Sequence, residues 1–394
     1  MQDYELLGRN QSLFASDIGK NEKAISDIIG GSSFLVIGGA GSIGSAVVRE
    51  LFKRNAKSLD VVDISENNLV ELVRGLRSSI GYNTGEFRTF AIDCGSDEFA
   101  RLMGDTSYDY VLNLSALKHV LSEKDPYTLM RMIRVNILNT ISSLEMAVAG
   151  GAKKYFCVST DKAANPVNMM GASKRIMEMF LFSDKSASTV STARFANVAF
   201  SDGSLLHGFN NRFLRNQPIT APRDIERYFL TQQESGELSL MSALFGDRGE
   251  IFFPKDGEKL KLTKFTDIAC KFLIDKGYQP IECESEDEAR RAAEQLIGEH
   301  KWPVYFFDSD TSGEKYFEEF YVDAEMVDFD RYDNMGVVKN SPGADAQKLK
   351  YFLAEIERLE HSNSWTKSDL VALFNELIDN FNHIETGRNL DQRM

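Results

Sequence analysis

The sequence predicts an α/β fold, a doubly wound parallel sheet with helices on both faces. Three observations support this class. Short apolar runs alternate with helical patterns as far as about residue 275, a glycine-rich turn follows the first of these runs, and no repeat or low-complexity segment interrupts the order. Strands that alternate with helices in this way are typical of βαβ units that share one parallel sheet.

The elements can be placed in chain order. An amphipathic helix is expected over residues 15–31, because Ile18, Ile25, Ile28 and Ile29 fall on roughly one helical face. Strands are expected in the apolar runs that follow, which read "SFLVIGG", "SLDVVDI", "FRTFAID", "YDYVLNLSA", "KKYFCVST", "TVSTARFANV" and, later, "GEIFFP".

From about residue 276 the chain becomes more acidic and helical. The stretch "ECESEDEARRAAEQLIGEH" begins with Ser285 and Glu288 at capping-box spacing, and "SWTKSDLVALFNELIDNF" has Thr366 as its N-cap. Acidic runs of this kind are usually solvated helix faces, which is the interpretation adopted here.

Composition restricts the kinds of partner. The chain has 394 residues, 43% of them hydrophobic and 26% charged, as expected for a globular enzyme with one large domain or two lobes. Its net charge of −14 would repel nucleic acid over most of the surface. A small phosphorylated ligand remains compatible with this charge if a few cations converge on it.

Cysteine usage and hydropathy predict a cytoplasmic protein without a metal site. The four cysteines form no CxxC pair and have no metal-ligand spacing with the five histidines, so we expect reduced thiols. The first residues do not read as a signal peptide, and no apolar run is long enough for a membrane span. We therefore expect no membrane association.

The strongest local motif is "FLVIGGAGSIGSAVVREL". Its glycines follow an apolar strand and open a helix, as in Rossmann-type dinucleotide sites. Small residues let the backbone approach a pyrophosphate, whose charge is favoured by the free amides of the helix N-terminus. The residues expected to contact a cofactor here are Gly38, Gly41, Ser42, Ile43 and Gly44.

Asp63 ends the next strand, where a carboxylate can accept hydrogen bonds from an adenosine ribose. The alternative is a carboxylate that caps the helix beginning near Ser65. A carboxylate here would repel a 2′-phosphate, and Ile64 and Ser65 supply no arginine to hold one. The sequence therefore favours NAD over NADP.

Residues after the third and fourth strands are further cofactor candidates. An acidic residue and a thiol end the third strand, where the adenine would lie, although a plain polar strand end is the alternative. Small residues after the fourth strand would let the backbone pass close to the cofactor. These candidates are Asp93, Cys94, Leu114, Ser115 and Ala116.

Several segments together resemble the extended short-chain dehydrogenases, and most closely the bacterial 4,6-dehydratases that act on UDP-N-acetylglucosamine. They are "GGAGSIGSAVVREL", "DISENNL", "NLSALKHV", "STDKAANPVNMMGASKR", "RFANVAFSDGS" and "RYFLT". The resemblance covers about residues 30–275, and "SGEKYFEEF" (312–320) is similar to a further family segment. The Asp-Lys pair after Ser-Thr is the most specific part, because sugar epimerases lack it and dTDP-glucose dehydratases carry Asp-Glu there.

The chain departs from the family at three places. Met170 stands four residues before Lys174, where a tyrosine is usual, although a branch of the family shares this substitution. Ala196 replaces the glycine of "RFGNV". The sequence "FSDGS" replaces "GSRGS", which removes an arginine and leaves the substrate contacts there open.

The resemblance implies a reaction and the residues that perform it. A hydride would pass from C4 of the sugar to NAD⁺, the C5 proton and C6 hydroxyl would leave as water, and the hydride would return to C6. Asp161, kept protonated by burial, would protonate the C6 oxygen, and Lys162, kept neutral, would take the C5 proton. Lys174 would bind the nicotinamide ribose, and Thr160 would orient the C4 oxygen.

Without the tyrosine, the C4 hydroxyl proton needs another acceptor. Ionised Asp161, or a water held by Thr160 and Lys174, would serve, and Met170 would fill the space. Three alternatives stay open. "STDK" is an ordinary capping turn, the loss of tyrosine marks a nucleotide-binding protein without catalysis, or the protein is a 4-epimerase, which has no use for an acid–base pair at C5 and C6.

The resemblance also implies a UDP-sugar substrate and a homo-oligomer. Four residues are expected at the substrate, although each of them would otherwise be taken as a surface or loop residue: Lys118, His119, Asn197 and Arg227. Helices after the fourth and fifth strands commonly pair two subunits in this superfamily, so a homodimer or higher oligomer is expected.

The expected organisation has three parts. Residues 1–30 form an N-terminal helical arm, and residues 31–275 form a Rossmann-type NAD-binding domain with an interleaved, smaller substrate-binding lobe. Residues 276–394 form an acidic, mostly helical region that completes this lobe.

Overall fold

The computed structural model describes residues 3–82, 85–183, 188–257, 259–309, 315, 318–339, 344–362, 364–379, 381 and 383. The strands are β1 (Ser33–Ile37), β2 (Ser58–Asp63), β3 (Glu86–Ala91), β4 (Tyr110–Asn113), β5 (Lys154–Thr160), β6 (Thr189–Phe195), β7 (Asn197–Val198), β8 (Ile219–Pro222), β9 (Glu226–Arg227), β10 (Phe229–Leu230), β11 (Glu250–Pro254), β12 (Thr263–Lys264), β13 (Gln279–Glu282), β14 (Lys301–Phe307), β15 (Met326–Asp328) and β16 (Met335–Lys339).

The α-helices are α1 (Asp3–Leu6), α2 (Ala15–Gly31), α3 (Ser42–Lys53), α4 (Glu66–Ser79), α5 (Asp97–Asp105), α6 (Pro126–Ile133), α7 (Asn139–Ala149), α8 (Met169–Ser183), α9 (Leu205–Leu214), α10 (Gln232–Phe245), α11 (Phe265–Asp275), α12 (Glu286–Gly298), α13 (Ala346–Ser362) and α14 (Lys367–Leu377). Short 3₁₀ turns cover Val120–Glu123 (η1) and Asp161–Ala163 (η3), and a π-helical turn, η2 (Arg134–Leu138), joins α6 to α7.

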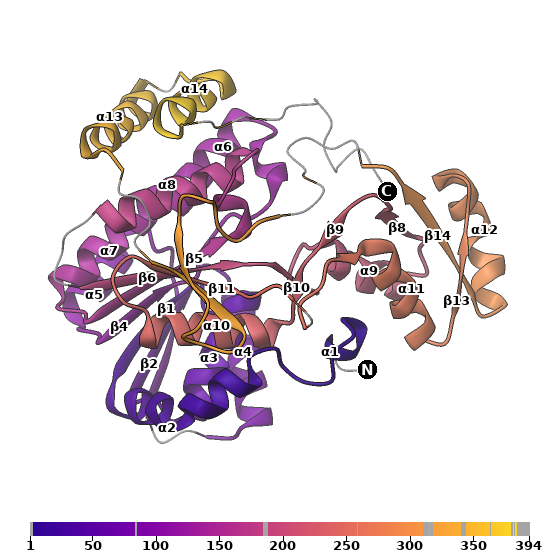
Figure 1. Cartoon of the computed structure of the whole chain (residues 1–394), viewed down its shortest axis with the longest axis horizontal. Helices are drawn as coiled ribbons and strands as arrows, with labels where there is room; N and C mark the ends of the chain where they lie inside the picture. Colours follow the sequence, from indigo (N-terminus) through magenta and orange to yellow (C-terminus); the bar gives the residue numbers. More distant parts are fainter. Residues whose placement is uncertain are drawn as a thin grey trace.

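The main sheet confirms the predicted fold class. Its nine strands lie in the order β15-β16-β11-β6-β5-β4-β1-β2-β3, and every pair from β11 to β3 is parallel. Strand order 3-2-1-4-5-6 defines a doubly wound sheet, whose ligand crevice lies where the winding reverses, between β1 and β4. Figure 1 shows helices on both faces of this sheet.

Strand β1 explains why the sheet is covered on both faces. Phe34 and Val36 belong to the core formed with α2, α3, α4 and α10, whereas Leu35 and Ile37 belong to the core formed with α5, α7 and α8. Side chains alternate along a strand, so an apolar run must be buried from both sides. The predicted helix over residues 15–31 is α2, with Ile18, Ile25 and Ile29 buried.

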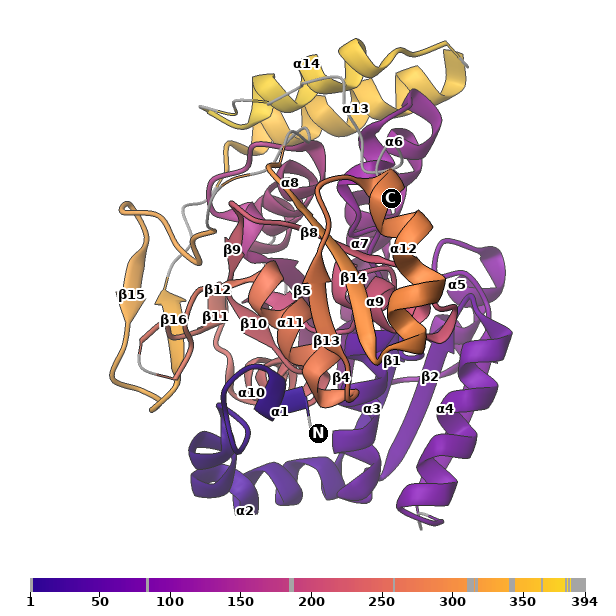
Figure 2. The ribbon, with the colours of Figure 1, turned by 90° about the vertical axis from the view of Figure 1, so that its right-hand side faces the viewer.

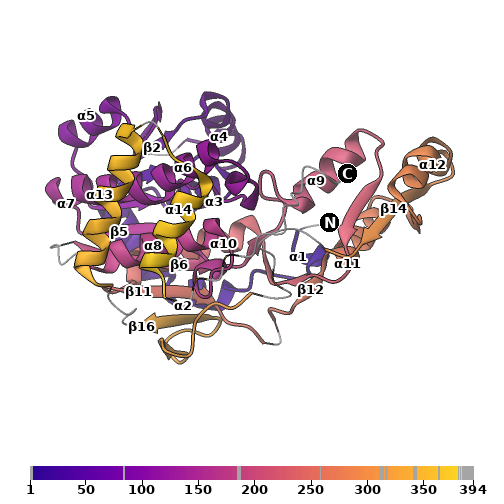
Figure 3. The ribbon, with the colours of Figure 1, turned by 90° about the horizontal axis from the view of Figure 1, so that it is seen from above.

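A smaller lobe stands beyond the carboxyl ends of the main-sheet strands (Figure 3). It consists of β8, α9, α11, β13, α12 and β14, and the strands form a parallel sheet in the order β13-β14-β8. Its apolar core includes Phe209, Phe272 and Trp302. The lobe therefore combines chain segments from both sides of residue 276.

Residues after 276 occupy three places and include strands as well as helices. Strands β13 and β14 lie in the small lobe, while β15 and β16 extend the main sheet through the antiparallel pairing of β16 with β11. Helix α14 begins as predicted at Thr366, which forms a capping box with Asp369. Ser285 likewise caps α12, but the Glu288 side chain accepts the Glu284 amide and not that of Ser285.

Helices α13 and α14 form a hairpin that lies over α6 and α8 (Figures 1 and 2). Phe352, Ile356 and Phe374 of the hairpin pack in one apolar cluster with Ile133 of α6 and Ile176 of α8. The hairpin thus covers part of the surface on which subunit pairing was predicted, and the oligomeric state stays a prediction.

Two absences hold for the residues that the structure describes. None of their helices combines the length and the apolar character needed to cross a bilayer. Within the same residues, no group of three or more histidine, cysteine, aspartate or glutamate side chains could hold a metal ion.

Candidate active site

A cavity of about 600 Å³ lies at the carboxyl ends of β1, β4, β5 and β6, against the small lobe. This is the size of an ordinary small-molecule site. Most of the predicted site residues share its wall: Gly38, Gly41, Ser42, Ile43, Gly44, Leu114, Ala116, Lys118, His119, Thr160, Lys162, Lys174 and Asn197. Asp63, Asp93, Cys94, Ser115, Asp161 and Arg227 are not part of that wall.

The glycine turn after β1 forms a cradle that larger residues would fill. Gly38 has φ +72°, and a Cβ atom there would lie 2.7 Å from the Ser115 amide nitrogen. A Cβ atom on Gly44 would collide with the Gly38 carbonyl and lie 2.7 Å from Gly39 Cα. The turn therefore brings the N-terminus of α3 against bare backbone, which fits a pyrophosphate.

The Gly44→Ala variant is expected to lose affinity for NADH by about 5- to 150-fold, because overpacking of this kind shifts backbone at a cost of about 1–3 kcal/mol. Titration of protein fluorescence with NADH measures this. Gly75→Ala is the matched control, since a Cβ there meets nothing within 4 Å. Equal affinities of the two variants would show that the turn does not carry the cofactor.

Asp63 binds backbone amides on both sides of the end of β2. Its Oδ2 accepts the Ala40 amide of the glycine turn at 3.0 Å, and its Oδ1 accepts the Ser65 amide at 2.9 Å. Ser65 itself caps α4 by accepting the Asn68 amide at 3.3 Å. The carboxylate thus joins the glycine turn to the end of β2. A ribose contact by Asp63 from this position stays a prediction.

The cofactor candidates after the third strand, Asp93 and Cys94, take part in local contacts. Asp93 Oδ1 accepts the Gly95 amide at 2.8 Å. The Cys94 thiol lies 3.9 Å from the Ser115 hydroxyl and accepts from Asn139 at 3.6 Å. Burial raises the pKa of Cys94, so it is a neutral thiol and not a nucleophile. An adenine contact by Asp93 and Cys94 stays a prediction.

The end of β5 presents the predicted acid and amine as a bonded group. Asp161 is 3% exposed, and its Oδ1 accepts the Thr160 hydroxyl at 2.8 Å and the Lys162 amide at 2.9 Å. Lys162 Nζ donates to the same oxygen at 3.1 Å. Thr160 and Lys162 line the cavity, so Asp161 is connected to it through both neighbours.

Lys162 is surrounded by three oxygen acceptors. Besides Asp161, its Nζ donates to Asn197 Oδ1 at 3.4 Å and lies 3.6 Å from Glu318 Oε1. Burial lowers the pKa of Lys162, but the carboxylates of Asp161 and Glu318 raise it by more, so the pKa is raised above its usual value. This corrects the expectation that the resting amine is neutral, because the nearby carboxylates outweigh desolvation.

Two residues near Lys162 have positions that the sequence did not indicate. Glu318 comes from the segment "SGEKYFEEF", of which residues 312–314, 316 and 317 lie outside the described residues. Arg227, expected at the substrate phosphates, is 4% exposed, and its charge acts on Lys162 and Glu318. The similarity of the 312–320 segment to the family was the one available signal for Glu318.

Helix α8 places Lys174 and Met170 in the cavity wall. Lys174 is 3% exposed, donates to the Val158 carbonyl at 3.0 Å, and has a pKa lowered by burial. Met170 is buried and packs in the apolar cluster shared with α6 and α14. Its thioether offers no proton.

The departure "FSDGS" forms one rim of the cavity. Lys118 Nζ donates to the Ser201 hydroxyl at 3.2 Å, and a Cβ atom on Gly203 would lie 2.6 Å from His119 Nε2. Asp202 accepts the Ser42 hydroxyl at 3.0 Å and donates its own amide back to Ser42 Oγ at 2.9 Å. The loop thus connects the N-terminus of α3 to Lys118 and His119, which were predicted at the substrate.

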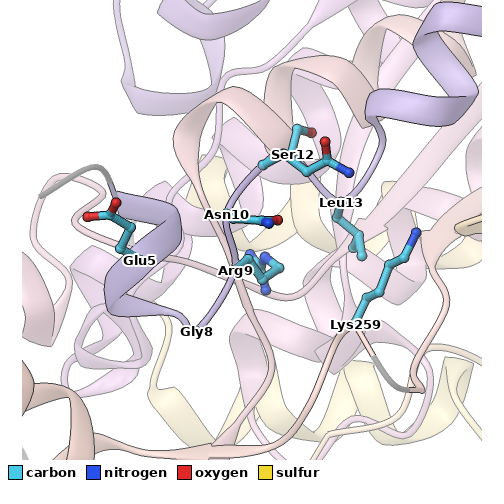
Figure 4. A pocket seen from close by; sticks show the side chains of 8 residues that line it. Glu5, Gly8, Arg9, Asn10, Ser12, Leu13 and Lys259 are labelled. Carbon is cyan, nitrogen blue, oxygen red and sulfur yellow. The ribbon is translucent and has the colours of Figure 1, made fainter.

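A second cavity, of about 550 Å³, lies at the N-terminal segment (Figure 4). Glu5, Arg9 and Lys259 are among the residues that line it. Arg9 pairs with the buried Glu234 at 2.6 Å, which neutralises the cation. Thr160, Lys162 and Lys174, which are among the predicted reactive side chains, line the first cavity.

The doubly wound sheet, the glycine cradle at α3 and the buried lysine of α8 define a protein of the extended short-chain dehydrogenase fold. The chain belongs to the polysaccharide biosynthesis protein family, whose match covers residues 34–340.

Curated relatives agree with this placement. An uncharacterised membrane protein of Methanocaldococcus jannaschii is 30% identical, with 85% of this chain and 99% of that protein covered. The inverting UDP-N-acetylglucosamine 4,6-dehydratase of a Campylobacter jejuni strain is 27% identical, with 90% and 98% covered. The chain is 32% identical to the capsular polysaccharide biosynthesis protein CapD of Staphylococcus aureus but spans only 44% of its length.

Solved structures share the fold. DesIV, a dTDP-glucose 4,6-dehydratase from Streptomyces venezuelae determined with NAD bound, superposes with a TM-score of 0.56. It is 17% identical, and the superposition covers 73% of this chain and 87% of DesIV.

Proposed function

We propose that this protein is an NAD-dependent 4,6-dehydratase that converts UDP-N-acetylglucosamine, or a close UDP-N-acetylhexosamine, to the 4-keto-6-deoxy sugar for deoxyamino-sugar or surface-glycan synthesis. The observation that carries the proposal is the hydrogen-bonded set Thr160–Asp161–Lys162 at the end of β5, in the same cavity as Lys174 and the glycine cradle. The Campylobacter relative with this activity, which is similar over nearly the whole chain, supports it.

The cradle and Asp63 support NAD as the cofactor. When bound, the nicotinamide would accept a hydride from C4 and return it to C6. Lys174, at the base of the cavity, would bind the nicotinamide ribose in place of the Val158 carbonyl that it now contacts. The Asp63 carboxylate beside the glycine turn would repel a 2′-phosphate, which favours NAD over NADP.

The Thr160–Asp161 hydrogen bond offers a route for the proton that tyrosine usually takes. Thr160 lines the cavity and already donates to Asp161 Oδ1 at 2.8 Å. The threonine hydroxyl would accept the C4 hydroxyl proton as it passes its own proton to Asp161. Asp161 would then hold a proton in reach of the site, and Met170 would have no part in proton transfer.

The same proton would serve the elimination. Oxidation at C4 makes the C5 proton acidic, so an amine can remove it while the C6 oxygen leaves as water. Protonated Asp161 would donate to the C6 oxygen, and Lys162 would take the C5 proton as a general base. The two groups share a hydrogen bond, so they would act together in the elimination.

Lys118 and His119 at the rim support a nucleoside diphosphate-sugar, Lys118 as an amine and His119 as a neutral hydrogen-bonding ring, because burial and Lys118 lower the pKa of His119. Both face the loop that includes Asp202, and both line the cavity. Asn197 lies against Lys162, so we assign it to that amine as well as to the sugar. Arg227 is buried beside Lys162 and Glu318, and its proposed role is therefore electrostatic.

NMR of UDP-N-acetylglucosamine with the protein and NAD⁺ in D₂O tests the proposal. The expected product is the 4-keto-6-deoxy sugar with deuterium at C5, because the removed proton exchanges with solvent before C5 is protonated again. The same spectrum reports whether the configuration at C5 is inverted, as the name of the Campylobacter relative states for that enzyme.

Two other outcomes would contradict the dehydratase. A 4-epimer without loss of water would identify an epimerase, the activity named for a Rickettsia bellii relative that is 28% identical over 57% of this chain. Bound NAD with no change in any of several UDP-sugars would identify a nucleotide-binding protein without catalysis.

A further inference from the structure

A buried carboxylate from the C-terminal part of the chain reaches the acid–amine pair. Glu318 is 4% exposed, and its Oε1 lies 3.6 Å from Lys162 Nζ. Its other oxygen, Oε2, is buried and accepts no hydrogen bond within the described part of the chain, although Lys315 Nζ lies 3.9 Å away. Burying a carboxyl oxygen without a partner costs stability, so its place beside Lys162 points to a use in the site.

The segment that carries Glu318 is held by an arginine of the main sheet. Arg194, at the end of β6, is fully buried and donates to the Phe320 carbonyl at 2.9 Å. The same guanidinium binds both oxygens of Glu325, at 2.7 and 2.8 Å. Two anchors close to Glu318 in the chain therefore hold its position relative to β5.

Four charged side chains act on the Glu318 carboxylate. Lys162 and Asp161 face it from the end of β5, Arg227 faces it from β9, and Lys315 faces it from its own segment. Burial raises the pKa of Glu318, and the cations offset this only in part. A carboxylate this close to a buried ammonium stabilises the charged form of the amine.

We propose, on the basis of the dehydratase function above, that Glu318 is a positioning residue that holds Lys162 as an ammonium in the resting site and so sets the pH range in which its amine can act on C5. The ammonium loses one proton to solvent before the reaction. The neutral amine then takes the C5 proton. After the hydride has returned to C6, Lys162 gives a proton back to C5, so the cycle closes.

The pH–rate profile of Glu318→Gln tests this role. In the wild type, kcat/KM should rise with pH as the Lys162 ammonium loses its proton, and then level off. In the variant no carboxylate at this position holds the ammonium, so the amine becomes free at lower pH. The rise of the profile should therefore move to lower pH by about 1–3 pH units, the usual effect of one nearby opposite charge. Glu318→Asp should restore the wild-type position of the rise.

Lysine labelled with ¹³C at Cε gives a readout that does not depend on turnover. The Lys162 resonance is identified by its loss in Lys162→Arg. The carboxylate of Glu318 helps to raise the pKa of Lys162, so Glu318→Gln should shift the Lys162 titration to lower pH. Glu319→Gln is the matched control, since Glu319 is exposed and contacts Asn165 at 2.7 Å. It should change neither the titration nor the rate profile.

The outcomes separate this inference from the proposed function. An unchanged pH–rate profile together with an unchanged Lys162 titration in folded Glu318→Gln would overturn the role of Glu318. A slower variant whose profile keeps the wild-type shape would show only structural support and would overturn it as well. Absence of turnover by the wild type would contradict the dehydratase instead, and the titration alone would then decide whether Glu318 holds the Lys162 ammonium.

Discussion

The Lys162→Ala variant is expected to lose nearly all water elimination from UDP-N-acetylglucosamine, with kcat lowered about 10³-fold, within the range found for removal of a general base. The reason is geometric. Lys162 is the amine in the cavity wall at the end of β5, held by Asp161 at 3.1 Å and by Asn197 at 3.4 Å. Product formation is followed by NMR, and retained NAD by the absorbance of cofactor released on denaturation.

Binding of NAD should survive this substitution, because the glycine turn lies on β1 and α3. Lys271→Ala, at an exposed position of α11, is the control for lysine loss and should keep full activity. Near-normal turnover of Lys162→Ala would remove Lys162 from the mechanism.

Asp161→Asn provides the companion measurement. An amide keeps an oxygen that can accept from Thr160 and Lys162, yet it cannot hold and release the proton. Its kcat should fall to a similar extent. Groups that act as a unit are not additive, so the double variant should be little slower than either single one. Additive losses would show two separate roles.

The Arg194→Met variant is expected to lose about 3–5 kcal/mol of unfolding free energy, the usual result of removing one partner from a buried ion pair. Arg194 is fully buried and binds Glu178 at 2.8 and 3.0 Å and Glu325 at 2.7 and 2.8 Å. Without the guanidinium, two buried carboxylates would lie together without a cation of this geometry. Urea unfolding followed by circular dichroism measures the loss.

The control is an arginine with the same charge at the surface. Arg223 is half exposed and pairs with Glu282 at 3.2 Å, so Arg223→Met should cost no more than about 1 kcal/mol. Adding Glu178→Gln to Arg194→Met should recover part of the loss, because it removes one of two buried carboxylate charges that would have only Arg175, at 3.3 and 3.5 Å, as their cation. Equal stability of the two arginine variants would show that the buried network does not hold the fold.

The fold class and the cofactor cradle were predictable because their determinants are local. Short apolar runs between helical patterns specify β1 to β6. The spacing of Gly38, Gly41 and Gly44 follows from the contact of α3 with the turn after β1. The N-cap at Thr366 was equally local, since the capping box involves only Asp369, three residues away. Each of these features depends on residues close together in the chain.

The composition of the reactive group could be predicted only in part. "STDK" indicated Thr160, Asp161 and Lys162, and the structure brings the three into hydrogen-bond contact. The protonation state of Lys162 was predicted in the wrong direction, because the carboxylates of Asp161 and Glu318 together outweigh burial. The sequence does not show that Glu318 lies 3.6 Å from the amine. A pKa depends on every charge within a few ångströms, whatever its distance along the chain.

The sequence by itself determined the doubly wound sheet, the dinucleotide turn and the residue types of the acid–amine pair, since these follow from periodicity and short-range spacing. Only the tertiary structure decided that β15 and β16 would extend the main sheet, that α13 and α14 would cover α6 and α8, and that Arg194 would hold the segment of Glu318 against Lys162. These contacts join residues far apart in the chain, where burial and charge pairing between separate elements decide which arrangement is most stable.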